Sequence, residues 1–295
     1  MASELRIGFI GAGIMGIPMA GNLMQAGFAL RIYTRTRTKA EPLLKDGATW
    51  RDSPAELARD ADVIISMVSD SPDVADVYLG TAGVCGSLRP GTLCIDMSTV
   101  SPDVARRVAA EIEKHGCAFL DAPVSGGKTG AEAGTLTIMV GGTSRDLDRA
   151  RPVLTVLGKS IVHCGPVGHG QLTKLCNQIL CGLNLLAVCE ALVFARRAGL
   201  DPEILLQAVS TGAAASWALS NLGPRMIRRD FAPMFMIDLQ QKDLRIALGM
   251  AQEQAVPLPG TALVSQLLAA NQAAHEGRDG TQGLIKTLER LASLP

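Results

Sequence analysis

Short apolar runs alternate with stretches that place an apolar residue at every third or fourth position along the first 165 residues. The runs predict buried strands, and the three-to-four spacing predicts amphipathic helices. Strands are expected over residues 7–10, 29–33, 62–68, 92–97, 117–121, 135–141 and 160–163. Helices are expected over residues 53–61, capped by Ser53, over 73–79, over 101–115, capped by Ser101, and over 144–157. This alternation favours an α/β fold with a parallel sheet covered on both faces.

The pattern changes after Gly165, because only helical spacing follows. The longest predicted helix, 171–198, is apolar almost all round, which indicates a buried helix. It is long enough to cross a membrane, but polar side chains interrupt it and argue against that role: Lys174, Asn177, Gln178, Asn184 and Glu190. Further helices are expected to begin at Asp201-Pro202 and to cover residues 216–228, 238–254, 261–275 and 280–294.

Three glycines with the spacing G-x-G-x-x-G follow the first apolar run: Gly11, Gly13 and Gly16. The first permits a tight turn, the second permits close approach of a pyrophosphate, and the third permits close helix–strand packing. The following helix, expected to begin near 12–14, directs its N–H groups at the phosphates. The expected cofactor-binding turn is therefore Gly11, Ala12, Gly13, Ile14, Met15 and Gly16.

The fold is accordingly expected to be α/β. A Rossmann dinucleotide-binding domain is expected over residues 1–164. An all-helical substrate and oligomerisation domain is expected over residues 165–295, and the long helix joins the two.

The second strand ends without the acidic residue that usually holds the ribose 2′-hydroxyl of NAD. Thr34, Arg35 and Thr36 stand there instead, followed by Arg37. A guanidinium can bind a 2′-phosphate through paired hydrogen bonds. This favours NADP over NAD, although NAD is possible and the cations could simply form a solvated loop.

Composition and charge exclude several classes of partner. The 28 basic and 28 acidic residues balance, so no basic field indicates nucleic acid or an anionic membrane. The seven cysteines are odd in number and form no C-x-x-C pair, which is typical of free thiols in a reducing compartment. The first strand begins too early to leave room for a signal peptide, so we expect a cytoplasmic protein. The spacing of His163, Cys164 and His169 matches no zinc pattern, and no metal is expected.

Two lysines are candidates for proton transfer. Lys174 lies in the apolar helix, with Asn177 and Gln178 one turn on along the same face. Burial lowers the pKa of a lysine, which would suit it to acid–base chemistry, but a lysine in the first turn can also extend to solvent. Lys242 could equally be a surface lysine paired with Asp238.

Four segments in this order resemble the β-hydroxyacid dehydrogenase family, which includes 3-hydroxyisobutyrate dehydrogenases. They are G-F-I-G-A-G-I-M-G, D-A-P-V-S-G-G, G-x-x-T-K-L-x-N-Q and F-x-I-D-L-x-x-K-D-L. The resemblance covers essentially the whole chain. Within the family, the segments T-K-L-C-N-Q, A-S-W-A-L and D-F-A-P-M-F-M-I-D-L most resemble the members that reduce tartronate semialdehyde.

The resemblance implies roles for individual residues. Lys174 matches the catalytic lysine, and Ser125, Gly126 and Gly127 match the loop that holds the substrate carboxylate. The implied contacts of the cofactor are Val68, Ser69, Thr99 and Lys242, and Met67 and Asp73 are expected to contact it as well. Many members have asparagine at the position of Gln178, so whether Asn177 or Gln178 faces substrate stays open. Met234 replaces an expected glycine and would narrow the pocket.

The resemblance therefore implies an NADPH-dependent reductase that converts tartronate semialdehyde to glycerate, with Lys174 as general acid and base. The substrate is expected between the carboxyl edge of the sheet and the helical domain. A 3-hydroxyisobutyrate dehydrogenase and a succinic semialdehyde reductase are the alternatives within enzymes. A non-catalytic NADP(H)-binding module is the alternative in another class, because fold does not fix function. The apolar helices favour a homodimer or homotetramer.

Overall fold

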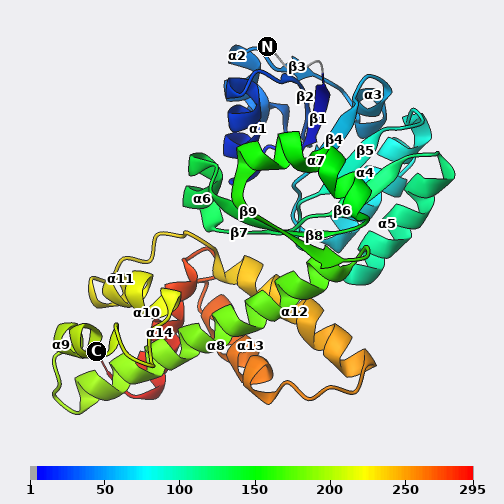
Figure 1. Ribbon diagram of the computed structural model, residues 1–295. Coiled ribbons are helices and arrows are strands. Elements are labelled where there is room, and N and C mark those ends of the chain that lie inside the picture. The colour runs from blue at the N-terminus through cyan, green and yellow to red at the C-terminus, as the bar shows by residue number, and fades with distance from the viewer. Residues whose placement is uncertain (1–4, 295) are drawn as a thin grey trace. The chain divides into compact units, whose positions relative to one another are not determined.

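The structure, a computed structural model, describes residues 5–294. The chain divides into two compact units, Met1–Lys174 and Leu175–Pro295, which are described separately (Figure 1). The strands are β1 (Arg6–Ile10), β2 (Ala29–Tyr33), β3 (Thr49–Trp50), β4 (Val63–Ser66), β5 (Leu93–Asp96), β6 (Ala118–Asp121), β7 (Val124–Ser125), β8 (Leu136–Gly141) and β9 (Gly158–Gly165).

The helices of the first unit are α1 (Gly16–Gln25), α2 (Glu41–Lys45), α3 (Pro54–Arg59), α4 (Ser71–Leu79), α5 (Pro102–Lys114), α6 (Gly127–Ala133) and α7 (Ser144–Leu157), with 3₁₀ turns η1 (Arg37–Ala40) and η2 (Val84–Ser87). Those of the second unit are α8 (His169–Arg197), which begins in the first, α9 (Pro202–Val209), α10 (Trp217–Asn221), α11 (Gly223–Ile227), α12 (Ile237–Glu253), α13 (Pro259–Ala273), η3 (Thr281–Gly283) and α14 (Leu284–Leu291).

One sheet runs through the first unit in the order β3-β2-β1-β4-β5-β6-β8-β7, with β9 also paired to β8. The strands from β3 to β6 are parallel, which confirms the predicted Rossmann arrangement. The sheet is not parallel throughout, because at one edge β8 runs antiparallel to β6 and β7. The sequence pattern did not indicate this reversal because it places strands without fixing their direction.

Helices cover both faces of the sheet, as expected. One core layer gathers α1, α2, α6 and α7, and the other gathers α3, α4 and α5 (Figure 1). Successive residues of β4 enter opposite layers, Ile65 the first and Ile64 the second, because side chains alternate along a strand. The predicted helix caps at Ser53 and Ser101 are confirmed. The side chains of Ser53 and Ser101 accept hydrogen bonds from the first turns of α3 and α5.

Helices α8 to α14 pack around a separate core in the second unit. The predicted helix 216–228 is instead two short helices, α10 and α11, because Pro224 has no N–H to donate to the preceding turn. The expectation that the long helix is buried holds for one face of α8 only. Cys189 is fully buried, whereas Leu180 and Phe194 are 61% and 75% exposed in the single chain.

Within residues 5–294, one helix, α8, has the length and composition of a membrane span. Core helices of globular domains commonly meet the same test, so this feature alone does not indicate a membrane protein.

Candidate active site

The carboxyl ends of the parallel strands meet in one row. Pairing aligns Tyr33 with Ile10, Ile10 with Ser66, Ser66 with Asp96, and Asp96 with Asp121. The loops that follow these strands therefore lie at one edge of the sheet, where ligands bind in doubly wound folds. The structure brings together there the glycine turn and the loops that contain Thr34, Met67 and Thr99.

The glycine turn has the geometry that its spacing predicts. Gly11 has a φ of +110°, and a Cβ on it would overlap the carbonyl oxygen of Met67. A Cβ on Gly16 would overlap the carbonyl oxygen of Gly11, so this glycine permits the close packing of α1. The space beside Gly13 is open to 4 Å, which fits the approach of a pyrophosphate. Helix α1 begins at Gly16, later than the expected 12–14, because residues 14–15 form a turn.

Two expected cofactor residues contact each other. A guanidinium nitrogen of Arg35 lies 2.9 Å from a carboxylate oxygen of Asp73 in the first turn of α4. Arg35 is 74% exposed and Asp73 is 24% exposed. The neighbouring Arg37 lies 5.3 Å above the ring of Trp50. The two arginines that follow β2 therefore have different surroundings, and the charge of Arg35 is balanced by Asp73.

The proposed carboxylate loop joins β7 to α6. Ser125 ends the strand, and Gly126 and Gly127 follow with φ values of +133° and +60°. Side chains other than hydrogen rarely tolerate this region, so the loop requires glycine at both positions. It leads directly into α6, whose Ala131 carbonyl accepts a hydrogen bond from Asn22 of α1 at 2.8 Å.

Lys174, 7% exposed, lies at the end of the second turn of α8, and two polar groups fix this part of the helix to the sheet. The carboxylate of Asp121 accepts the main-chain N–H groups of Gly168 at 2.7 Å and Gln171 at 2.8 Å. The amide of Gln171 donates to the Ser98 carbonyl at 2.8 Å and accepts from the main chain of Val100 at 3.0 Å. Burial raises the pKa of Asp121 to about 6 against the effect of these bonds.

The two candidate amides belong to a cluster in the second unit. The amide nitrogen of Gln178 donates to Asp243 at 2.5 Å and to Gln240 at 3.3 Å, and its oxygen accepts from Asn177 at 2.9 Å. Lys242 lies 2.8 Å from the other oxygen of Asp243. Lys242, with its side chain 14% exposed, therefore pairs with a buried carboxylate, and the carboxylate of Asp238 accepts from Gln272 of α13.

Four buried polar residues of the two units were not singled out from the sequence: Asp96, Asp121, Gln171 and Asp243. Asp121 opens the segment D-A-P-V-S-G-G, and Asp96 ends an apolar strand. An acid at the end of a buried strand is a usable signal, because such a carboxylate needs partners in the adjoining loop.

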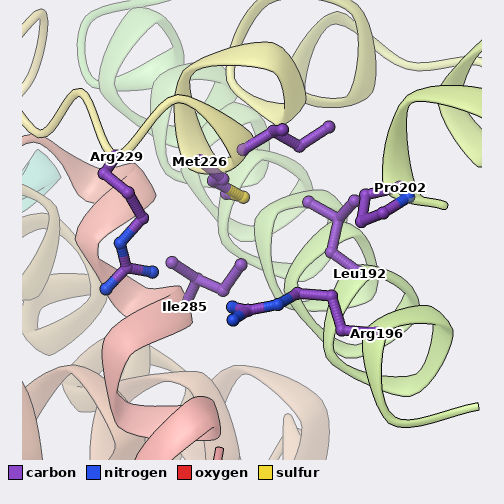
Figure 2. Close-up of a pocket in the computed structure, with 7 residues that line it drawn as sticks. Leu192, Arg196, Pro202, Met226, Arg229 and Ile285 are labelled. Carbon is purple, nitrogen blue, oxygen red and sulfur yellow. The ribbon is translucent and has the colours of Figure 1, made fainter. Parts of the chain in front are cut away.

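A cavity of about 290 Å³ lies elsewhere, between α8, α11 and α14. Figure 2 shows Arg196 and Arg229 directed toward its Ile285 wall. Both arginines pair with Glu289, which is 5% exposed. The residues that line the cavity are mostly apolar, and the ion pairs join α8 to α14, so we assign this feature to packing. Among residues 5–294, no cluster of three or more His, Cys, Asp or Glu side chains could hold a metal.

Two family models match the chain. Residues 6–165 match the NAD-binding domain of 6-phosphogluconate dehydrogenase, and residues 168–288 match the NAD-binding domain of NADP-dependent 3-hydroxyisobutyrate dehydrogenase.

Among similar proteins, 2-hydroxy-3-oxopropionate reductase of Escherichia coli is 42% identical over 289 residues, which cover 98% of this chain and 99% of the relative. An uncharacterized oxidoreductase of Bacillus subtilis is 42% identical over 280 residues, with 95% and 97% covered. The solved 3-hydroxyisobutyrate dehydrogenase of Mycobacterium tuberculosis with L-serine has a TM-score of 0.90 and 35% identity, covering 97% of this chain and 99% of that one. With both units matched over nearly their whole length, the chain belongs to the 3-hydroxyisobutyrate dehydrogenase-related family of NAD(P)-dependent oxidoreductases.

Proposed function

We propose that the chain is an NADPH-dependent reductase of a small aldehyde acid, with tartronate semialdehyde converted to glycerate. The observation that carries the proposal is the buried Lys174 on a helix start that Asp121 and Gln171 hold at the carboxyl edge of the sheet. The E. coli relative named 2-hydroxy-3-oxopropionate reductase supports this substrate.

Lys174 acts on the oxygen of the reacting carbonyl. The nicotinamide cofactor supplies the hydride when it is bound. The ammonium of Lys174 stabilises the negative charge that develops on the carbonyl oxygen and donates a proton to it. In the oxidative direction, the neutral amine accepts the alcohol proton. A helix start fixed by two polar side chains supplies the orientation that such proton transfer requires.

The open space beside Gly13 and the loops after β2, β4 and β5 fit a dinucleotide. Arg35 binds the 2′-phosphate of the cofactor, and its ion pair with Asp73 breaks when it does so. This contact favours NADPH over NADH. The remaining proposed contacts are Thr34, Thr36, Met67, Val68, Ser69, Thr99 and Lys242.

The substrate carboxylate is bound by the Ser125 hydroxyl and by the main-chain N–H groups of Ser125, Gly126 and Gly127. Of the two amides, we assign the substrate contact to Asn177. The nitrogen of Gln178 already donates to Asp243 and Gln240, and its oxygen accepts from Asn177. Gln178 thus orients the amide of Asn177 by accepting a hydrogen bond from it. Exposed Leu180, Phe194 and Trp217 in the helical unit support a homodimer or homotetramer.

A 3-hydroxyisobutyrate dehydrogenase is the second candidate. The M. tuberculosis enzyme of that name shares the fold over 97% of this chain. Both candidates use the same lysine and carboxylate loop, and they differ in whether the carbon next to the carboxylate bears a hydroxyl or a methyl group. A hydrogen-bond donor in the pocket that pairs with the substrate hydroxyl would favour tartronate semialdehyde. The methyl analogue would leave that buried donor unpaired and would therefore react less efficiently.

The test is a steady-state panel of tartronate semialdehyde, methylmalonate semialdehyde, succinic semialdehyde and an aldehyde without a carboxylate, each with NADPH and NADH. We expect kcat/KM to be highest for tartronate semialdehyde with NADPH and to fall by orders of magnitude for the aldehyde without a carboxylate. A preference for methylmalonate semialdehyde would establish the second candidate, and no turnover of any aldehyde despite NADPH binding would indicate a non-catalytic binding module.

A further inference from the structure

The buried carboxylate of Asp96 lies beneath the proposed cofactor loops. It ends β5 and is 0% exposed. One oxygen, Oδ1, accepts the hydroxyls of Ser66 and Ser98, each at 2.7 Å, and the main-chain N–H of Ser98 at 3.3 Å. Within the described chain, the other oxygen, Oδ2, is buried without a hydrogen-bond partner. A carboxylate in this state opposes folding, so a purely structural purpose explains it poorly.

The hydroxyl protons fix the direction of the network. Each serine has one O–H, and both are donated to Asp96. The oxygen of Ser98 is therefore an acceptor for the main-chain N–H of Val68 at 2.9 Å. The oxygen of Ser66 is correspondingly an acceptor for the hydroxyl of Tyr78 at 3.0 Å. The hydrogen bonds from Asp96 through Ser98 therefore reach the loop after β4, and we call them the Ser98 branch. Those through Ser66 end at the buried side chain of Tyr78 in α4.

The Ser98 branch touches two parts of the site. Val68 follows Met67, whose carbonyl packs against Gly11 of the glycine turn. The carbonyl of Ser98 accepts from Gln171 of α8 at 2.8 Å, and Lys174 stands three residues further along that helix. One serine thus contacts both the cofactor-side loop and the anchor of the helix that contains the proposed catalytic lysine.

We propose that Asp96 is a positioning residue of the cofactor site, which acts through the Ser98 hydroxyl to hold the Met67–Val68 loop in its cofactor-binding form. The inference rests on the proposed function, because it takes this loop as a cofactor contact. The ionised carboxylate keeps the Ser98 hydroxyl turned inward, so that its oxygen stays available to the N–H of Val68. Burial raises the pKa of Asp96 to about 6, which leaves the group ionised at neutral pH.

The two serines provide a matched pair of variants. Both side chains are 0% exposed and both donate to the same oxygen at 2.7 Å, but only Ser98 contacts Val68. We expect Ser98→Ala to raise the Kd of NADPH, measured by fluorescence titration of the whole chain, by about tenfold. Ser66→Ala should change it by less than about twofold. Amide exchange at Val68, followed by NMR, should accelerate in Ser98→Ala alone.

A double-mutant cycle tests whether Asp96 acts through Ser98. Asp96→Asn removes the charge with little change of shape, and we expect it to weaken NADPH binding in the natural chain but not further in the Ser98→Ala background. The inference would be overturned if Asp96→Asn and Ser98→Ala raised the Kd of NADPH independently, so that their effects multiplied in the double variant. Equal losses of affinity in Ser98→Ala and Ser66→Ala would also overturn it. Failure of the natural chain to bind NADPH would instead refute the proposed function, so the two failures are distinguishable.

Discussion

The carboxylate of Asp121 accepts the main-chain N–H of Gln171 at 2.8 Å and so joins the end of β6 to the first turn of α8. The same carboxylate accepts from Gly168, and together these bonds satisfy N–H groups that a helix start otherwise leaves unpaired. A negative charge at this end also complements the helix dipole. The position of Lys174, one turn further on, therefore depends on an acid more than fifty residues earlier in the chain.

Asp121→Asn is expected to lower both stability and turnover. The NH₂ group of the new asparagine would face one of the two main-chain N–H donors. Because both groups are donors, that main-chain N–H would be left unpaired, at a cost of about 1–3 kcal/mol. Differential scanning calorimetry should show a lower Tm, and kcat should fall because Lys174 is displaced. Asp103→Asn provides the control, since this acid also begins a helix but is exposed and lies on α5. Equal effects of the two substitutions would contradict the prediction.

Asp96 is expected to make the fold less stable as the pH rises from about 4 to 6. Burial raises the pKa of this carboxyl from 3.8 to about 6, so within that interval the folded chain holds a proton that the unfolded chain has released. The free energy of unfolding therefore falls with pH and becomes constant above the folded pKa. Asp96→Asn cannot titrate and should gain up to about 3 kcal/mol relative to the natural chain across the interval.

Urea unfolding of the natural chain and of Asp96→Asn at pH 4, 5, 6 and 7 measures this difference. Asp121 has a similarly raised pKa and is present in both proteins, so its contribution cancels except for the repulsion between its carboxylate and that of Asp96. A difference that stays constant with pH would show that Asp96 does not hold its proton in the folded chain.

The ion pairs beside the cavity in Figure 2 are expected to stabilise the helical unit. Glu289 is 5% exposed and pairs with both Arg196 and Arg229, which are themselves 33% and 49% exposed. Glu289→Gln should reduce the free energy of unfolding by about 1–3 kcal/mol, a value kept modest because water screens the two arginines. Urea unfolding provides the measurement, and Glu111→Gln, which removes an exposed pair on α5, should have almost no effect. Equal losses in both variants would argue against a structural role for this cluster.

Local signals in the sequence predicted the parts of the fold that depend on neighbouring residues. The glycine turn and the caps at Ser53 and Ser101 follow from spacing alone, because each involves residues within a few positions. The partners that fix α8 could not be predicted in this way. Gln171 contacts Ser98 across 73 residues, and that contact exists only once the sheet order is known. The helical pattern singled out Lys174 and the family resemblance implied its catalytic role, whereas the buried acid that holds its helix emerged only from the structure.

Arg35→Ala is expected to reduce the catalytic efficiency with NADPH but not that with NADH. The guanidinium is 74% exposed and pairs with Asp73, so it is available to a 2′-phosphate that competes for it. We expect kcat/KM for NADPH to fall at least about tenfold while that for NADH changes little. Arg37→Ala is the control, because this arginine instead stacks on Trp50. Equal losses with both cofactors, or equal efficiency of NADH and NADPH in the natural chain, would count against the assignment.

Lys174→Ala is expected to lower kcat by a factor of about 10²–10⁴, the range for loss of acid–base catalysis. NADPH affinity should change little, because the lysine is assigned to the carbonyl oxygen of the substrate. Lys174→Arg should not restore activity, since a guanidinium stays protonated and cannot act as the base. The oxidative rate of the natural enzyme should rise with pH as the lysine deprotonates, and this rise should be absent in the alanine variant. Near-normal kcat in Lys174→Ala would exclude the lysine as proton donor and make Lys242, 14% exposed beside Asp243, the next candidate.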